Sequence, residues 1–139
     1  MPNPPKFEPQ RGARGRGITI LPATGRTGAP PAWPLPDPPS EAERTAWAEL
    51  WTTPQASAWE RLRWTRTVGR YCRMMVAAES ADATAALLAQ VTVLEDRLGL
   101  TPKAMRMLLW QIAPDEVAQK RAESGTPTAR QRLRAVDTG

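Results

Sequence analysis

The sequence predicts an all-α fold, a small helical core of about four helices between an extended N-terminal arm and a basic C-terminal tail. Eleven of the 15 prolines lie in residues 1–39. From residue 40 onward, apolar side chains recur at helical spacing, and helix-start signals precede each stretch. The chain therefore divides into an arm at 1–39, a helical oligomerisation core at 40–113, and a short helix with a basic tail at 114–139.

The arm combines its prolines with five of the nine glycines. Such a composition buries too little apolar surface to offset the entropy lost on ordering, so we expect an extended, largely disordered segment. Within it, Ile18–Leu21 is compatible with a short strand, and Trp33 is a candidate docking point. The segment RGARGRG is similar to Gly-Arg segments that bind nucleic acid, although a solubilising tail has the same composition.

The first two helices have clear start signals. Ser40 and Glu43 form a capping box, in which each side chain satisfies a free backbone N–H of the first turn. This helix should end before Pro54, because the residue before a proline is disfavoured in the α region. Thr53 then acts as N-cap for a second helix, with the proline at its first position, predicted to run to about Glu79.

The second helix is strongly amphipathic. Gly69 within it predicts a close helix–helix approach. Its apolar face carries Trp64, Val68, Tyr71 and Met75. Its opposite face carries a row of arginines: Arg63, Arg66, Arg70 and Arg73. The row contains no acidic residue, which favours contact with a polyanion over a merely solvated face.

Ser80 or Asp82 is the expected cap of a third helix that ends near Leu98, where Gly99 supplies a left-handed C-cap. Thr101 and Pro102 open a fourth helix that ends before Pro114. A last short helix is expected from Pro114 to about Glu123, followed by the basic tail. A two-heptad apolar seam along the third helix is suited to helix packing: Leu87, Val91, Leu94 and Leu98.

The corner at 97–110, RLGLTPKAMRMLLW, has two interpretations. In a DNA-reading helix-turn-helix, only Lys103, Arg106 and Gln111 would suit base edges. Against this, Glu95 stands where the two helices need a small side chain, and the second helix is too apolar to remain in water. We therefore interpret it as an assembly corner, buried against another subunit through Leu87, Val91, Leu94, Leu98, Met107 and Trp110.

The composition limits the chemistry. The net charge of +5 and pI near 10.3 favour polyanionic partners, although 16 arginines against three lysines also fit GC-rich coding. The chain has no His, and Cys72 is its one cysteine, which excludes an internal disulfide and Cys/His zinc sites. Cys72 is expected to be buried filler. No signal peptide, membrane span, metal or cofactor is predicted, so we expect a soluble intracellular protein.

Two segments, ELWTTPQASAWERLRWTRTVGRYCRMM and LEDRLGLTPKAMRMLLWQI, resemble the small terminase subunits of tailed phages that infect actinobacteria. The preceding LPATGRTGAPPAWPL is similar to the same group, and the resemblance covers roughly residues 18–113. It implies a non-enzymatic, mostly helical ring subunit in the host cytoplasm. This subunit binds double-stranded viral DNA and delivers it to the terminase large subunit, which carries the ATPase and nuclease. The N-terminal helix-turn-helix frequent in that group is not visible in the arm.

The leading hypothesis places DNA phosphates on basic side chains, with specificity from DNA shape or a few base contacts. One alternative is a dimeric helix-turn-helix transcription regulator. Another is a structural or scaffolding protein that assembles without binding nucleic acid, and an enzyme is the least expected class. The candidate DNA-binding residues are Arg11, Arg14, Arg16, Arg63, Arg66, Arg70, Arg73, Arg130, Arg132 and Arg134.

Overall fold

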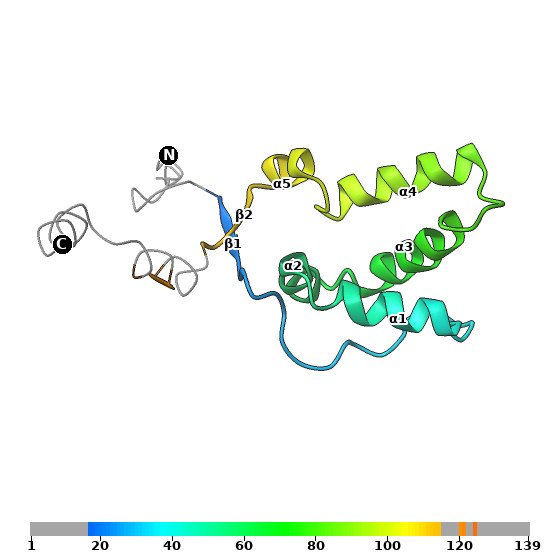
Figure 1. Ribbon diagram of the computed structural model, residues 1–139, viewed down its shortest axis with the longest axis horizontal. Helices are drawn as coiled ribbons and strands as arrows, with labels where there is room; N and C mark the ends of the chain where they lie inside the picture. Colours follow the sequence, from blue (N-terminus) through cyan, green and yellow to red (C-terminus); the bar gives the residue numbers. More distant parts are fainter. Residues whose placement is uncertain (1–16, 115–119, 122–123, 125–139) are drawn as a thin grey trace, which may run out of the picture.

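The computed structural model describes residues 17–114, 120, 121 and 124 (Figure 1). Within these residues the chain is mostly helical, which confirms the coarse prediction. It forms five helices and two short strands in the order β1 Thr19–Leu21, α1 Glu41–Leu50, α2 Pro54–Leu62, α3 Thr65–Ala78, α4 Ala85–Arg97, α5 Pro102–Leu108 and β2 Trp110–Ile112.

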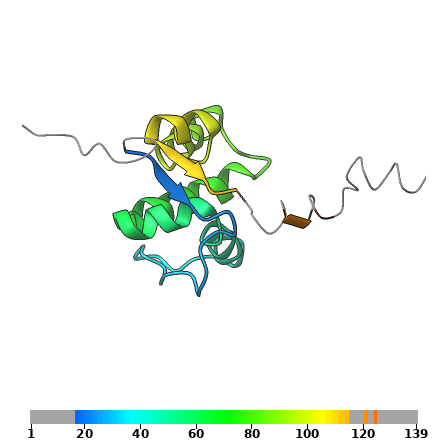
Figure 2. The same cartoon turned by 90° about the vertical axis from the view of Figure 1, so that its left-hand side faces the viewer.

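The two strands correct the all-α prediction. β1 and β2 pair in parallel, with Ile20 opposite Gln111, at the end of the molecule away from the α3–α4 turn (Figures 1 and 2). Leu109 takes a left-handed φ of 57°, so α5 ends at Leu108 and the chain turns directly into β2. Pairing with β1 supplies the backbone hydrogen bonds that a longer helix would have supplied.

The second predicted helix is broken into α2 and α3. Arg63 adopts a left-handed φ of 59° and ends α2, and the backbone N–H of Trp64 donates to the carbonyl of Trp59 at 2.9 Å. Every side chain here is compatible with a helix, so periodicity alone does not reveal the break. Because of this break, Trp59 contacts the end of α4, whereas Trp64 contacts the ring of Trp110.

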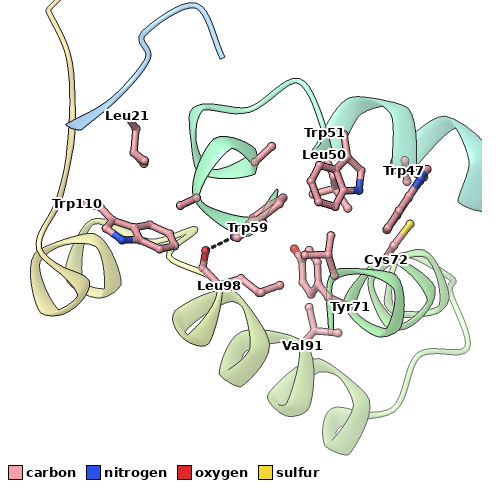
Figure 3. Packing of buried hydrophobic residues seen from close by; sticks show 14 residues of the cluster. Leu21, Trp47, Leu50, Trp51, Trp59, Tyr71, Cys72, Val91, Leu98 and Trp110 are labelled. Atoms are coloured by element: carbon pink, nitrogen blue, oxygen red, sulfur yellow. Dashed lines mark hydrogen bonds between the residues drawn. The ribbon is translucent and has the colours of Figure 1, made fainter. Parts of the chain in front are cut away.

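Four tryptophans form a continuous row, with Trp47, Trp51 and Trp59 buried in the core and Trp33 at its edge. Edge-to-face contacts run from Trp33 to Trp47, Trp51 and Trp59, with ring centroids 5.2, 5.4 and 5.8 Å apart. Trp59 is fully buried, and its indole N–H donates to the carbonyl of Leu98 at 2.9 Å (Figure 3). The aromatic chain thus joins the N-terminal segment, α1 and α2 to the end of α4.

Residues 17–39 are packed, which corrects the prediction of a disordered arm over this range. Residues 22–39, the lead-in segment, run along α1 and α3. Trp33 lies against Trp47, whose indole N–H donates to the carbonyl of Pro31 at 2.8 Å. Gly69 of α3 admits Pro34 at a distance that a Cβ would not allow. Proline has a fixed φ and loses less entropy on ordering, so a few anchors hold this segment.

α4 begins later than predicted. Thr84 is its N-cap, and the Thr84 hydroxyl accepts from the backbone N–H of Leu87 at 3.1 Å. Ser80 instead closes a turn, in which its carbonyl accepts from the N–H of Ala83 at 3.1 Å. The 79–84 connection therefore consists of turns, and neither Ser80 nor Asp82 caps the helix.

Gly99 ends α4 as predicted, with a φ of 75°, and its missing Cβ leaves room for the ring of Trp110. We expect Gly99→Ala to lower the free energy of unfolding by about 1 to 2 kcal/mol through backbone strain. Overlap with the indole should cost about 1 to 3 kcal/mol in addition. Urea unfolding followed by tryptophan fluorescence measures both.

Gly28→Ala is the matched control for this substitution. Gly28 also has a positive φ, 97°, but its Cβ would point into open space. Its loss of stability should therefore be limited to the backbone strain. Equal losses in the two variants would contradict the close contact between Gly99 and Trp110.

Candidate nucleic-acid interface

The charges of the described body are segregated along the chain. Residues 17–114 contain ten basic and nine acidic side chains, so this body is nearly neutral overall. Residues 61–73 carry five arginines and no acidic residue, whereas residues 79–96 carry four acidic residues and no basic one. A nearly neutral body thus has one strongly basic region, around the α2–α3 junction.

Four of these arginines are exposed, and we call them the arginine cluster: Arg61, Arg63, Arg66 and Arg70. Arg61 lies in the last turn of α2, Arg63 ends that helix, and the other two lie one turn apart on α3. None of the four forms an ion pair with another residue of the described part of the chain. Their guanidinium groups are therefore available to an anion from outside.

The charge of Arg66 opposes the stability of α3, whereas Arg61 and Arg63, at the C-terminal end of α2, accord with the dipole of that helix. α3 has Arg66 in its first turn, no acidic residue there, and Glu79 at its C-cap. A helix is stabilised by the reverse arrangement, with negative charge at its N-terminus. Trp64, the N-cap, provides no side-chain acceptor for the free N–H groups of that turn. Arginine and helix dipole thus attract the same ligand, an anion.

Arg73 was predicted to be part of the DNA-binding row, but its guanidinium forms hydrogen bonds with other groups of the fold. Its Nε donates to the Glu43 carboxylate at 2.8 Å, and its Nη2 donates to the carbonyls of Asp37 and Pro38 at 3.1 and 3.2 Å. Its charge also lies 5.2 Å from the ring centre of Trp33. Arg73 therefore ties the lead-in segment to α1 and α3, and Arg61, which the helical period did not select, takes its place in the exposed set.

Arg26 has a comparable role at the other end of the lead-in segment. Its guanidinium pairs with Glu60 at 2.9 Å and lies 5.5 Å from the ring centre of Trp51. The hydrogen bond from Arg26 lowers the pKa of Glu60. Glu60 is the acidic residue next to the arginine cluster in sequence, so Arg26 neutralises the carboxylate that would otherwise compete with an anionic ligand. Sequence analysis did not single out Arg26.

The six predicted contacts in the arms lie outside the described residues: Arg11, Arg14, Arg16, Arg130, Arg132 and Arg134. The predicted helix after Pro114 also lies largely outside them. The candidate interface is therefore argued from the arginine cluster alone.

The α4–α5 corner offers little to a base edge. α5 has seven residues, with Lys103 and Arg106 exposed, and Gln111 lies on β2 instead of extending the helix. Glu95, which argued against a helix-turn-helix, accepts a hydrogen bond from the Tyr71 hydroxyl at 3.1 Å and so holds α4 to α3. The reading surface of the helix-turn-helix alternative is reduced to two side chains.

Most of the predicted oligomerisation residues are covered by the chain itself. Val91, Leu98 and Trp110 are buried, and Leu87 and Leu94 pack half-buried against the same core. Because α3 lies against this side of α4, the seam packs inside the subunit. Of the six, Met107 alone is exposed, with 76% of its surface accessible, and the fourth helix is too short to carry Trp110.

Aromatic side chains in the described residues are all at least half-buried. Trp33 and Trp64 are partly accessible at the edges of the core, and the remaining tryptophans and Tyr71 are buried. Proteins that bind single strands present aromatic faces on which bases stack. Trp64, the aromatic residue within the arginine cluster, is only partly accessible, so the chemistry of the cluster is suited mainly to phosphates.

Cys72 is buried as predicted, with its thiol 3.4 Å from the carbonyl of Glu43. Burial, together with the nearby Glu43 charge, raises the pKa of this thiol to about 11. It is therefore protonated at neutral pH and lacks the reactivity of a thiolate.

The described residues contain neither a cluster of metal ligands nor a membrane-spanning helix. No group of three or more His, Cys, Asp or Glu side chains there could hold a metal ion. No helix there is long and apolar enough to cross a membrane. Comparison with protein-family models, curated proteins and solved structures gave no match to this chain.

The contact between Glu43 and Arg73 predicts a pH-dependent stability. Burial acts to raise the pKa of Glu43, but hydrogen bonds from Arg73 and Ser40 outweigh it and lower the pKa below its usual value. The ionised carboxylate therefore stabilises the fold above its unfolded pKa of about 4.3, and this contribution is lost as pH falls through the lower folded value. Glu43→Gln should be less stable than the wild type at pH 7, and the gap should narrow towards pH 4.

Urea unfolding of both proteins at several pH values measures this gap. Glu41→Gln is the control, since Glu41 is exposed in the same first turn and forms no ion pair with a described residue. Its effect at pH 7 should be smaller. A gap for Glu43→Gln that stays constant from pH 7 down to about pH 3, below its unfolded pKa, would rule out the ionised contact as its source.

Proposed function

We propose that the chain is the small subunit of a phage terminase, a non-catalytic protein that binds double-stranded viral DNA and delivers it to the large subunit. The observation that carries the DNA-binding part is the arginine cluster. Four exposed arginines lie at one helix junction without an ion pair to any described residue, and Arg66 lies in the first turn of α3, against the preference of the helix dipole. The resemblance of residues 18–113 to small terminases supports the rest.

The geometry favours duplex DNA held by its backbone. Arg66 and Arg70 are one helical turn apart, about 6 Å along the axis, which suits neighbouring phosphates of a strand. The described residues offer no exposed aromatic ring for unpaired bases, and few groups for base edges. Specificity for a packaging site would then come from the shape and deformability of the DNA.

The proposal includes two protein partners. Further copies of the chain would form a closed assembly, the ring that the resemblance implies, which repeats the arginine cluster around the DNA and multiplies its field. The terminase large subunit would be the second partner and would supply the ATPase and nuclease. Exposed apolar side chains available for such contacts include Ile20, Leu88, Val93, Met107 and Leu109.

Two alternative functions predict different behaviour towards DNA. A helix-turn-helix regulator would read bases through Lys103 and Arg106 on α5, but α5 is only seven residues long. A scaffolding protein would assemble and leave DNA unbound even at low salt. The scaffolding alternative does not account for the exposed arginines at the α2–α3 junction, which form no ion pair with a described residue.

We expect the double reversal Arg66→Glu with Arg70→Glu to weaken binding of duplex DNA by at least about tenfold at 50 mM salt, because two phosphate contacts become repulsive. Fluorescence anisotropy with a labelled duplex measures the affinity. For the wild type, the affinity should fall steeply as salt rises. Replacing both arginines by alanine should reduce the slope of log affinity against log salt by about two.

The control is a double reversal of the same charge at other exposed positions, Arg44→Glu with Arg106→Glu. The affinity of this variant should change much less. A larger loss in the control than in the α3 variant would favour the regulator, and no retardation of wild-type protein at low salt would favour the scaffold.

A further inference from the structure

The outer face of α4 lacks charge. No charged residue occurs between Thr84 and Glu95. The inner side of the helix packs on α3, whereas Leu88 and Val93 are 49% and 40% exposed. The small residues Ala85, Ala86 and Ala89 are also exposed, and the polar residues on this outer side are the uncharged Gln90 and Thr92. An uncharged, largely apolar helix surface is typical of a contact with another molecule.

The two ends of this face differ in charge. Asp82 is exposed in the turns before α4, whereas Glu79, at the end of α3, lines a groove beside α1. At the other end, a groove of about 520 Å³ opens between α4 and α5, and Arg97 and Lys103 lie at its edge. Asp96 also lines the groove and accepts a hydrogen bond from the Thr101 hydroxyl at 2.7 Å. The remaining lining is apolar: Ala104, Met107 and Leu108.

We propose that two copies of the chain pair through the outer faces of α4, side by side and antiparallel. In this arrangement the acidic turn before one α4 lies at the basic groove of the other copy. The uncharged middle, around Ala89 and Val93, would lie at the two-fold axis, where small side chains allow the helices to approach closely. Each copy uses the same patch, as a two-fold contact requires.

Charge complementarity identifies the occupant as a second copy. An antiparallel copy brings Asp82 of each chain towards Arg97 and Lys103 of the other, whereas a parallel copy would bring like charges together. The antiparallel arrangement also opposes the two helix dipoles favourably. Met107, which is 76% exposed, would be buried by the turn before α4 of the other copy. The outer face of α4, with the charges at its two ends, is thus complementary to the same face of a second copy.

This pairing goes beyond the proposed role in DNA binding and does not depend on it. The arginine cluster is on α2 and α3, and none of its members lies on α4 or in the groove. A two-fold contact alone yields a dimer, so a larger closed assembly needs a second contact. The apolar side chains beside the sheet, Ile20, Leu109 and Ile112, remain outside the α4 contact.

The first test measures the mass of the full chain by sedimentation and native mass spectrometry. The 15.3 kDa chain should give a dimer or an even multiple at tens of micromolar. Val93→Glu should weaken association at least tenfold, because it places two like charges at the centre of the contact. Ala42→Glu is the matched control: it adds the same charge at an exposed position in the first turn of α1. It should associate like the wild type.

The second test exchanges the charges at the two ends of α4. Asp82→Lys and Arg97→Glu should each weaken association, and the double variant should restore it to within about threefold of the wild type. Asp82 precedes α4 and Arg97 is its last residue, so the two are separated by a helix about 20 Å long and do not meet within one chain. Rescue therefore reports a contact between copies.

Circular dichroism and tryptophan fluorescence establish that each variant is folded. Duplex binding by Val93→Glu, measured per chain, separates the two proposals, since loss of pairing should leave the arginine cluster intact. A monomeric wild type, only odd-numbered assemblies, unchanged association of Val93→Glu, or failure of the double exchange to restore weakened association would each overturn the α4 contact.

Discussion

The fold depends on the buried hydrogen bond between the Trp59 indole and the carbonyl of Leu98. This hydrogen bond lies where α2 meets the end of α4. Without it, the Leu98 carbonyl would be buried in the core with no hydrogen bond from Trp59. Gln55 donates to the next carbonyl, that of Gly99, at 3.2 Å. These two contacts fix the corner that directs α5 and then β2 towards β1. The tryptophan contacts hold β1 and β2 close together, and the pairing of these two strands then joins their segments.

Arginine has two roles in this protein, and its surroundings separate them. Arg26 and Arg73 each combine a carboxylate, a backbone carbonyl and an indole face, and together they hold the lead-in segment on the helices. By occupying Glu60 and Glu43, they also neutralise two carboxylates, and Glu60 is next to the arginine cluster in sequence. The four arginines of the cluster have no ion-pair partner among the described residues, which favours binding of a polyanion.

α4 illustrates how an apolar helix serves a small protein on two sides. Its inner seam, which includes Val91 and Leu98, completes the core of the single chain. Its outer face remains uncharged and is bounded by opposite charges. The seam alone suggested contact between subunits, but the core of so small a chain requires it. The second apolar side, less periodic and easier to overlook, is the one left for a neighbour.

Features set within one turn of helix were determined by the sequence alone. The caps at Ser40 and Thr101, the left-handed Gly99 and the buried face of α3 follow from residues three or four positions apart. The pairing of β1 with β2, the break at Arg63 and the partner of Arg73 join segments far apart or choose between locally equivalent conformations. Only the tertiary structure decided them, because their energies come from contacts that a short window of sequence does not contain.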